Sequence, residues 1–213
     1  MKSNLKIFAI LVIVTVFTFL LWKMEEGASG DLSSEVTTDF AIADTSLVTK
    51  IFIAGTDGES ALLERASDTR FWTLNGKHLA RKDATDLLLK TFARAEVKGA
   101  VPELQRSTVI RNFSGSGKKV EIYIGDDKLE KTWYIGTATP SHTGTYMLLE
   151  TPEDGKSQEP FIVHLEGFVG FLSTRFFTNE TEWRYTGVFD FPGRTLAEVK
   201  ITDHESPSKS YSI

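Results

Sequence analysis

The four histidines are the side chains best suited to metal binding or proton transfer, and they are scattered along the chain. His78, His142, His164 and His204 lie far apart, and none has a second histidine four positions away. That spacing is the one at which one helix face offers two imidazoles to a metal. Asp203-His204-Glu205 gathers three ligand types, but in a charged segment that is typical of a solvated turn. We therefore predict no metal site and no cofactor.

A serine- and glycine-rich stretch matches a phosphate-binding loop only in part. Ser114-Gly115-Ser116-Gly117-Lys118 ends in Gly-Lys, but Asn112 and Lys119 stand where the motif needs glycine and serine or threonine. A predicted helix precedes the stretch and a predicted strand follows it, whereas phosphate binding needs the loop to open a helix. We interpret the stretch as a helix-to-strand turn.

No catalytic nucleophile is recognisable in the sequence. The chain has no cysteine, which excludes thiolate catalysis, zinc–thiolate sites and disulfides. It has no Gly-x-Ser-x-Gly elbow, and adjacent acids such as Asp126-Asp127 fall in predicted turns. Because a triad built from distant positions leaves no local motif, a hydrolase stays open as a lower-ranked alternative.

Aromatic residues are concentrated between residues 161 and 191, with Arg175 and Arg184 among them and with Gly167 and Gly170 breaking the segment into turns. One interpretation is a contact surface, since aromatic and arginine side chains are common at interfaces. The other is that a loop-rich segment uses large side chains to fill a core. We expect the core role at most positions and the surface role at one or two. The residues proposed to contact a partner are Phe168, Phe171, Arg175, Trp183 and Arg184.

Local patterns predict the elements that must hold these residues in place. Alternating or apolar runs bounded by turn residues indicate strands at 50–54, 60–65, 71–74, 119–124, 131–135, 145–150 and 161–165. Apolar residues at helical spacing indicate helices at 84–95, with Asp83 as the cap, and at 103–113. Because strands and helices fall in separate blocks, we predict an α+β fold. It would have an antiparallel sheet or sheets, two or more helices packed on one side, and one N-terminal transmembrane helix.

The first segment reads as a membrane anchor. Residues 7–22 carry no charge, Lys2 and Lys6 precede them, and Glu25 and Glu26 follow. The positive-inside bias puts the N-terminus in the cytoplasm and the remainder outside. We predict a signal-anchor that spans the inner membrane once, with the C-terminal domain in the periplasm. Cleavage near Ala28 or Gly30, which would give a secreted form, is the alternative.

The rest of the chain divides into three parts. Residues 24–38 are rich in Gly, Ser, Thr and Glu and predict a flexible tether. Residues 39–194 predict one extracytoplasmic domain. Residues 195–213 predict the start of a second repeat, because Leu196-x-x-Val199-x-Ile201 repeats the spacing of Val48-x-x-Ile51-x-Ile53. We expect this repeat to be incomplete, so that its hairpin either joins the first sheet or needs a further region to cover it.

The net charge of the chain limits the classes of molecule that it is expected to bind. Without Lys2, Lys6 and Lys23, the chain holds 21 basic and 29 acidic residues, a net charge of about −8. Nucleic-acid binding calls for a basic face, so we predict no nucleic-acid partner. The same balance disfavours binding driven by an anionic lipid surface alone.

Several stretches make the sequence similar to a family of bacterial envelope proteins known as domain of unknown function 4340, in its Bacteroidetes-type form. The similar stretches include Lys50-Ile51-Phe52-Ile53-Ala54, Trp72-Thr73-Leu74-Asn75-Gly76-Lys77, Lys119-Val120-Glu121-Ile122-Tyr123, Gly144-Thr145-Tyr146-Met147-Leu148 and Pro160-Phe161-Ile162-Val163-His164-Leu165. The resemblance runs in order from about residue 38 to the end. It implies a single-anchor protein with an extracytoplasmic domain, in some relatives associated with ABC-type transport, and it implies no catalytic residues.

The sequence thus favours a membrane-anchored binding or scaffold module in the cell envelope, with no catalytic role and with an envelope protein as its partner. An accessory subunit of an envelope ABC-type transport system is the first alternative. An envelope hydrolase is the second.

Overall fold

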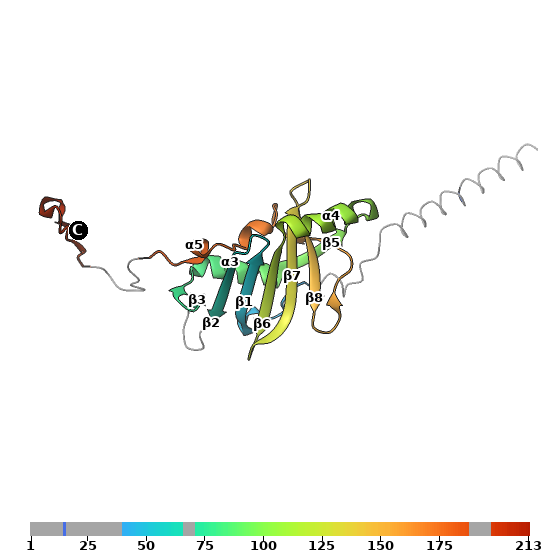
Figure 1. Ribbon diagram of the computed structural model, residues 1–213, viewed down its shortest axis with the longest axis horizontal. Helices are drawn as coiled ribbons and strands as arrows, with labels where there is room; N and C mark the ends of the chain where they lie inside the picture. The colour runs from blue at the N-terminus through green and yellow to red at the C-terminus, as the bar shows by residue number, and fades with distance from the viewer. Residues whose placement is uncertain (1–14, 16–39, 66–70, 188–196) are drawn as a thin grey trace, which may run out of the picture.

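The computed structural model describes residue 15 and residues 40–65, 71–187 and 197–213 (Figure 1). Apart from Thr15, the predicted anchor and tether lie outside these residues, as do Phe189, Phe191 and Leu196. No helix within the described ranges is long and apolar enough to cross a membrane.

An antiparallel sheet of ten strands forms the main body (Figure 1). Its strand order is β4-β3-β2-β1-β6-β7-β8-β10-β5, and β9 pairs with β8 beside that path. The strands are β1 (Val48–Gly55), β2 (Ser60–Arg65), β3 (Trp72–Leu74), β4 (His78–Leu79), β5 (Ala95–Ala100), β6 (Lys118–Ile124), β7 (Lys128–Ala138), β8 (Thr145–Thr151), β9 (Gly155–Lys156) and β10 (Phe161–Leu165). With its helices, the sheet makes this an α+β protein, which confirms the predicted class.

The first hairpin shows how local sequence sets the register. Gly58 takes a positive φ of 83° in the turn, a conformation that glycine adopts without strain. The turn pairs Ile51 with Leu63 and Ile53 with Ala61, and all four side chains are fully buried. The alternation of the two strands therefore places one apolar face against the core.

Helix α3 (Lys82–Arg94) packs on that apolar face of the sheet. Its Leu88 and Phe92 are fully buried, and the ring of Phe92 meets Trp133 of β7 edge-on, with 5.0 Å between the ring centroids. Side chains of β1, β2, β3, β5, β6, β7, β8 and β10 belong to the same cluster, so one core connects α3 with most of the sheet.

Helix α4 (Glu103–Ser116) packs on the opposite face. Its Val109 and Phe113 meet Tyr146 and Ile162 in a second, smaller cluster. Gly136 of β7 permits this approach, because a Cβ there would lie 3.0 Å from the ring of Phe113. The expectation that both helices cover one side is therefore wrong (Figure 1).

Strand β5 is the reason that the two helices separate. The chain passes directly from Arg94, the end of α3, into β5, which pairs with β10 at one end of the strand order. The sequence analysis predicted helices at 84–95 and 103–113 with no strand between them. Ala95 and Val97 are buried, whereas Glu96 and Lys98 are exposed. The segment thus has the alternation of a strand, but it is too short and too polar for that pattern to predict one.

The segment after β10 closes the core. It contains the short 3-10 helix η2 (Ser173–Arg175) and the helix α5 (Glu180–Trp183). Leu172, Phe176 and Trp183 are fully buried in the main cluster. The backbone N–H of Arg81 donates to the oxygen of Trp183, and the backbone N–H of Tyr185 donates to the oxygen of Leu79. Residues 183–185 therefore lie beside β4.

The C-terminal strands β11 (Lys200–Ile201) and β12 (Tyr211–Ser212) form a hairpin of their own, with the 3-10 helix η3 (Pro207–Lys209) between them. In the part of the chain that the structure describes, no strand pairing joins this hairpin to the ten-stranded sheet. It is therefore not an added edge strand, the first of the two outcomes considered from the sequence. The need for a further covering region stays a prediction.

Candidate functional site

The aromatic segment divides into a buried part and an exposed part. Trp183 is fully buried, and its indole Nε1 donates a hydrogen bond of 2.9 Å to the backbone oxygen of Phe177. The prediction that Trp183 contacts a partner is therefore wrong, because the side chain is part of the core. Arg184 is exposed, but it lies beside Ala80 at the β4 side.

The exposed part is the turn formed by residues 166–171, hereafter the 166–171 turn. Its tip carries two apolar side chains, Phe168 at 39% and Val169 at 86% exposure. Gly167 and Gly170 have φ angles of 72° and 154°. A Cβ on Gly170 would lie 2.7 Å from the Phe168 ring, so the ring occupies space that only glycine leaves open.

Arg175 lies between the Phe168 ring of this turn and Thr91 of α3. Its guanidinium lies 4.4 Å from the centroid of the Phe168 ring, a cation–π distance. The same group donates a 2.8 Å hydrogen bond to Thr91 Oγ1 on α3. Burial lowers the pKa of Arg175, and the nearby charge of Arg94 lowers that pKa further.

Arg94 holds the start of the turn. Its guanidinium donates a 2.8 Å hydrogen bond to the backbone oxygen of Glu166. Among the described residues, no carboxylate oxygen lies within 4.0 Å of a nitrogen of Arg94 or Arg175, since neither appears in any ion pair there. Arg94 and Arg175 thus both contact the 166–171 turn, and both have neutral partners.

Phe171 ends the turn and ties it to another loop. Its ring lies 5.8 Å from that of His142, which belongs to the loop between β7 and β8. The next residue, Leu172, donates its backbone N–H to Thr145 Oγ1 at 2.6 Å. Of the five predicted contact residues, the structure thus brings Phe168, Phe171 and Arg175 together and leaves Trp183 and Arg184 elsewhere. Arg94 and Val169 belong to the same site, and the sequence analysis missed both.

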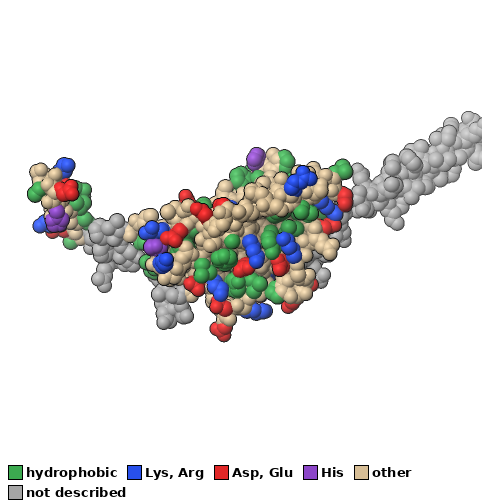
Figure 2. All heavy atoms as spheres, viewed as in Figure 1, with side chains coloured by type: hydrophobic (Ala, Val, Ile, Leu, Met, Phe, Trp, Pro, Cys, Tyr) green, Lys and Arg blue, Asp and Glu red, His purple; other side chains and the backbone are tan. Residues whose placement is uncertain are grey.

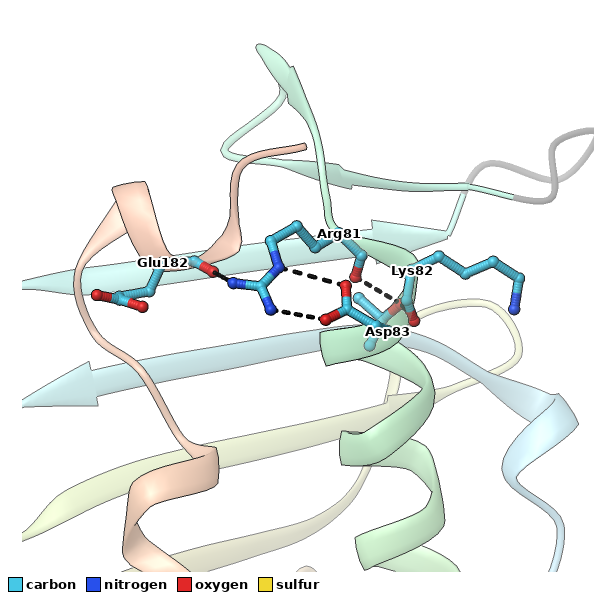
Figure 3. A network of polar contacts seen from close by, with 5 residues as sticks. Arg81, Lys82, Asp83 and Glu182 are labelled. Carbon is cyan, nitrogen blue, oxygen red and sulfur yellow. Dashed lines mark hydrogen bonds and ion pairs between the residues drawn. The ribbon is translucent and has the colours of Figure 1, made fainter. Parts of the chain in front are cut away.

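A second polar cluster lies at the start of α3 (Figure 3). Arg81 contacts both carboxylate oxygens of Asp83, at 2.6 and 3.2 Å, and donates to the backbone oxygen of Glu182 at 3.2 Å. Asp83 was predicted to cap α3, but Arg81 occupies the N-cap position and Asp83 lies in the first turn. The cluster joins α3 to α5, and the hydrogen bond from Arg81 lowers the pKa of Asp83.

A hollow of about 310 Å³ beside the end of α4 is lined by Lys118, Lys119 and Lys156. Each lysine already has a partner. Lys118 donates to the backbone oxygen of Ser173 at 3.1 Å, Lys119 pairs with Glu121 at 2.7 Å, and Lys156 lies 3.5 Å over the ring of Tyr134. Positive and negative side chains also mix across the face visible in Figure 2. Of these three lysines, only Lys119 is paired with a carboxylate, and Lys118 and Lys156 have neutral partners.

The serine- and glycine-rich stretch borders this hollow as the end of α4. The backbone N–H of Gly117 donates to the oxygen of Phe113 at 2.9 Å, which closes the helix. The stretch connects a helix to a strand, as predicted, but residues 114–116 are the last residues of α4 and not a turn. A helix C-terminus presents carbonyl oxygens, whereas a phosphate-binding loop opens a helix.

Two histidines have acidic neighbours. His78 lies 3.1 Å from Glu180 and His164 lies 3.9 Å from Glu96. Within the described ranges, no three side chains of His, Asp or Glu are grouped closely enough to hold a metal ion.

The comparisons with known proteins add no relative to this picture. No family model matches the chain, and no match was found among the curated proteins or the solved structures. The resemblance to the family of domain of unknown function 4340 stays an expectation from the sequence.

Proposed function

We propose that this protein is a membrane-anchored, non-catalytic binding module of the cell envelope, and that the 166–171 turn is its contact surface. The observation that carries the proposal is the exposure of Val169, 86%, at the tip of a turn whose base is fixed. Isolated apolar side chains are common on protein surfaces. A turn that presents two of them next to each other, with its start bonded to α3 and its end bonded to β8, is a more specific feature.

The fixation of the turn supports a binding role because an ordered surface loses little conformational entropy when it binds. Arg94 binds the first residue of the turn, Arg175 supports the Phe168 ring, and Leu172 is fully buried directly after the turn. The apolar tip is thus held out of the core by its own anchoring residues.

The anchor part of the proposal rests on the sequence. Residues 7–22 carry no charge between a basic and an acidic flank, and the positive-inside bias places the domain outside the cytoplasm. A reporter that is active only after export, fused behind Ile213, should be active. Activity of a reporter that works only in the cytoplasm would contradict this topology.

The contact role is tested by placing a photo-crosslinking amino acid at position 169 in the full chain, in its native membrane. The matched control is position 126, an exposed residue in the β6–β7 turn at the other end of β7. We expect a crosslinked product from position 169 and none from position 126. Equal labelling at the two positions, or none at 169, would refute the proposed surface. Capture of a subunit of a transport system would favour the accessory-subunit alternative.

A further inference from the structure

The surface around the 166–171 turn combines two features. One is the pair of arginines, Arg94 and Arg175, whose partners are the backbone oxygen of Glu166 and the hydroxyl of Thr91. The other is the exposed apolar tip formed by Phe168 and Val169. The exposed Leu87 lies one turn before Thr91 on α3 and extends the apolar character along the helix.

The arginine pair calls for an anion. Arg94 is bonded to the first residue of the 166–171 turn and Arg175 lies against the Phe168 ring of the same turn. The charge of Arg94 lowers the pKa of Arg175, so the two groups repel each other. No carboxylate within the described ranges pairs with either. Arginine binds a phosphate through two parallel hydrogen bonds. A phosphodiester between the two groups would therefore relieve the repulsion.

The exposed side chains of Phe168 and Val169 favour a partner in which hydrocarbon lies next to the anionic group. A membrane interface has this layering, with phosphates above acyl chains, and exposed side chains of such a tip can enter the boundary by several ångströms. A soluble phosphate compound would leave Val169 in water. The combination thus fits a lipid surface better than a free anion.

The chain enters the domain beside β7 and β10, where the backbone oxygen of Ala41 accepts a hydrogen bond from Lys131 and the ring of Phe40 packs on that of Phe161. Ile42 donates its backbone N–H to the oxygen of Phe92, and Arg94, two residues later in α3, binds Glu166. The predicted tether of residues 24–38 can span at most about 50 Å. A domain held this close to its own membrane meets the lipid at high effective concentration, so a weak docking contact is sufficient.

We propose that the 166–171 turn docks on the membrane that anchors the chain, with Phe168 and Val169 in the interface and with Arg94 and Arg175 on a lipid phosphodiester. This inference rests on the proposed contact surface and names its partner. It needs no anionic lipid, because zwitterionic headgroups carry the same phosphodiester, and it therefore agrees with the net negative charge of the domain.

The absence of cysteine makes the test direct. Val169→Cys gives a unique thiol in the full chain, which is labelled with an environment-sensitive fluorophore and reconstituted into vesicles of phosphatidylethanolamine and phosphatidylcholine. Asp126→Cys is the matched control site. We expect blue-shifted emission at position 169, with quenching by nitroxide-bearing lipids several-fold stronger than at position 126. Equal quenching at the two sites would overturn the proposal.

The arginines are tested in the Val169→Cys chain. Arg94→Gln with Arg175→Gln should reduce the quenching to the level of the control site, whereas the two lysine replacements should keep about half of it, because lysine binds phosphate as a point charge. Arg111→Gln, an exposed arginine on α4, should change nothing. A melting temperature within a few degrees of the parent shows that the variants are folded. Unchanged quenching in the glutamine variant would refute the role of the arginines.

The two proposals fail in different ways. A photo-crosslink from position 169 to a protein, together with control-level lipid quenching, overturns the lipid partner and leaves the contact surface standing. Neither a crosslink nor quenching would overturn both.

Discussion

Replacing Trp183 by alanine tests whether the segment after β10 is part of the core. The side chain is fully buried, its ring meets Phe177 edge-on at 5.3 Å, and its indole N–H is hydrogen-bonded to a backbone oxygen. Tryptophan-to-alanine changes at such sites cost about 3–5 kcal/mol. For a chain of this size, that corresponds to a fall in melting temperature of about 6–20 °C.

The assay is unfolding by urea and by heat, followed by circular dichroism, with Arg184→Ala as the matched control. Arg184 is the neighbouring residue and is exposed, so its replacement should change the free energy of unfolding by less than about 0.5 kcal/mol. Trp183→Phe should give an intermediate loss, because it keeps part of the buried area but leaves the backbone oxygen of Phe177 without its donor. Equal stability of Trp183→Ala and Arg184→Ala would refute the assignment of this segment to the core.

Three further outcomes are expected. Leu88→Ala should destabilise the domain by about 2–5 kcal/mol, since Leu88 is fully buried on α3, whereas Lys90→Ala, on the exposed side, should do almost nothing in the same melts. Gly170→Ala should cost about 1–3 kcal/mol through its φ of 154° and should displace the Phe168 ring, which aromatic NMR shifts would report. Asp83 has a lowered pKa in the folded state, so its stabilising effect is present above about pH 4 and is lost as the pH falls through the lowered value. Because the pair is exposed, Asp83→Asn should cost no more than about 1 kcal/mol at neutral pH and should remove this pH dependence of the free energy of unfolding.

Strands with strong local signals could be predicted from the sequence, and those without them could not. The hairpin of β1 and β2 has a glycine turn and a clear apolar alternation, and residues 60–65 and 161–165 were predicted with the bounds that the structure has. Strand β5 has the same alternation, but with alanine, glycine and charged residues. Its pairing with β10 joins segments more than sixty residues apart, and no local pattern encodes such a contact.

The prediction of the sheet face on which each helix packs depended on strand β5, which the sequence analysis did not find. With no strand predicted between them, the helices at 84–95 and 103–113 form one helical block, and a single covering layer is the simplest arrangement. Once β5 lies at the sheet edge, α4 can follow on the other side. The signal that was available is Gly136, which leaves room over β7 for the ring of Phe113. A glycine in a strand indicates close approach of another group, although it does not identify that group.

The contact surface, too, could be predicted only in part from the sequence. Phe168 and Trp183 both lie in the aromatic segment, yet one is exposed and the other is buried. Their difference arises from backbone direction, because Gly167 and Gly170 reverse the chain at the tip while residues 172–183 turn inward over α3. The arginines follow from the same geometry. Arg94 ends α3 and Arg175 ends η2, so two cations from distant parts of the sequence meet only when the chain closes over the helix. A composition-based analysis finds the aromatic segment, and only the closure of the fold selects which of its residues face outward beside a pair of cations.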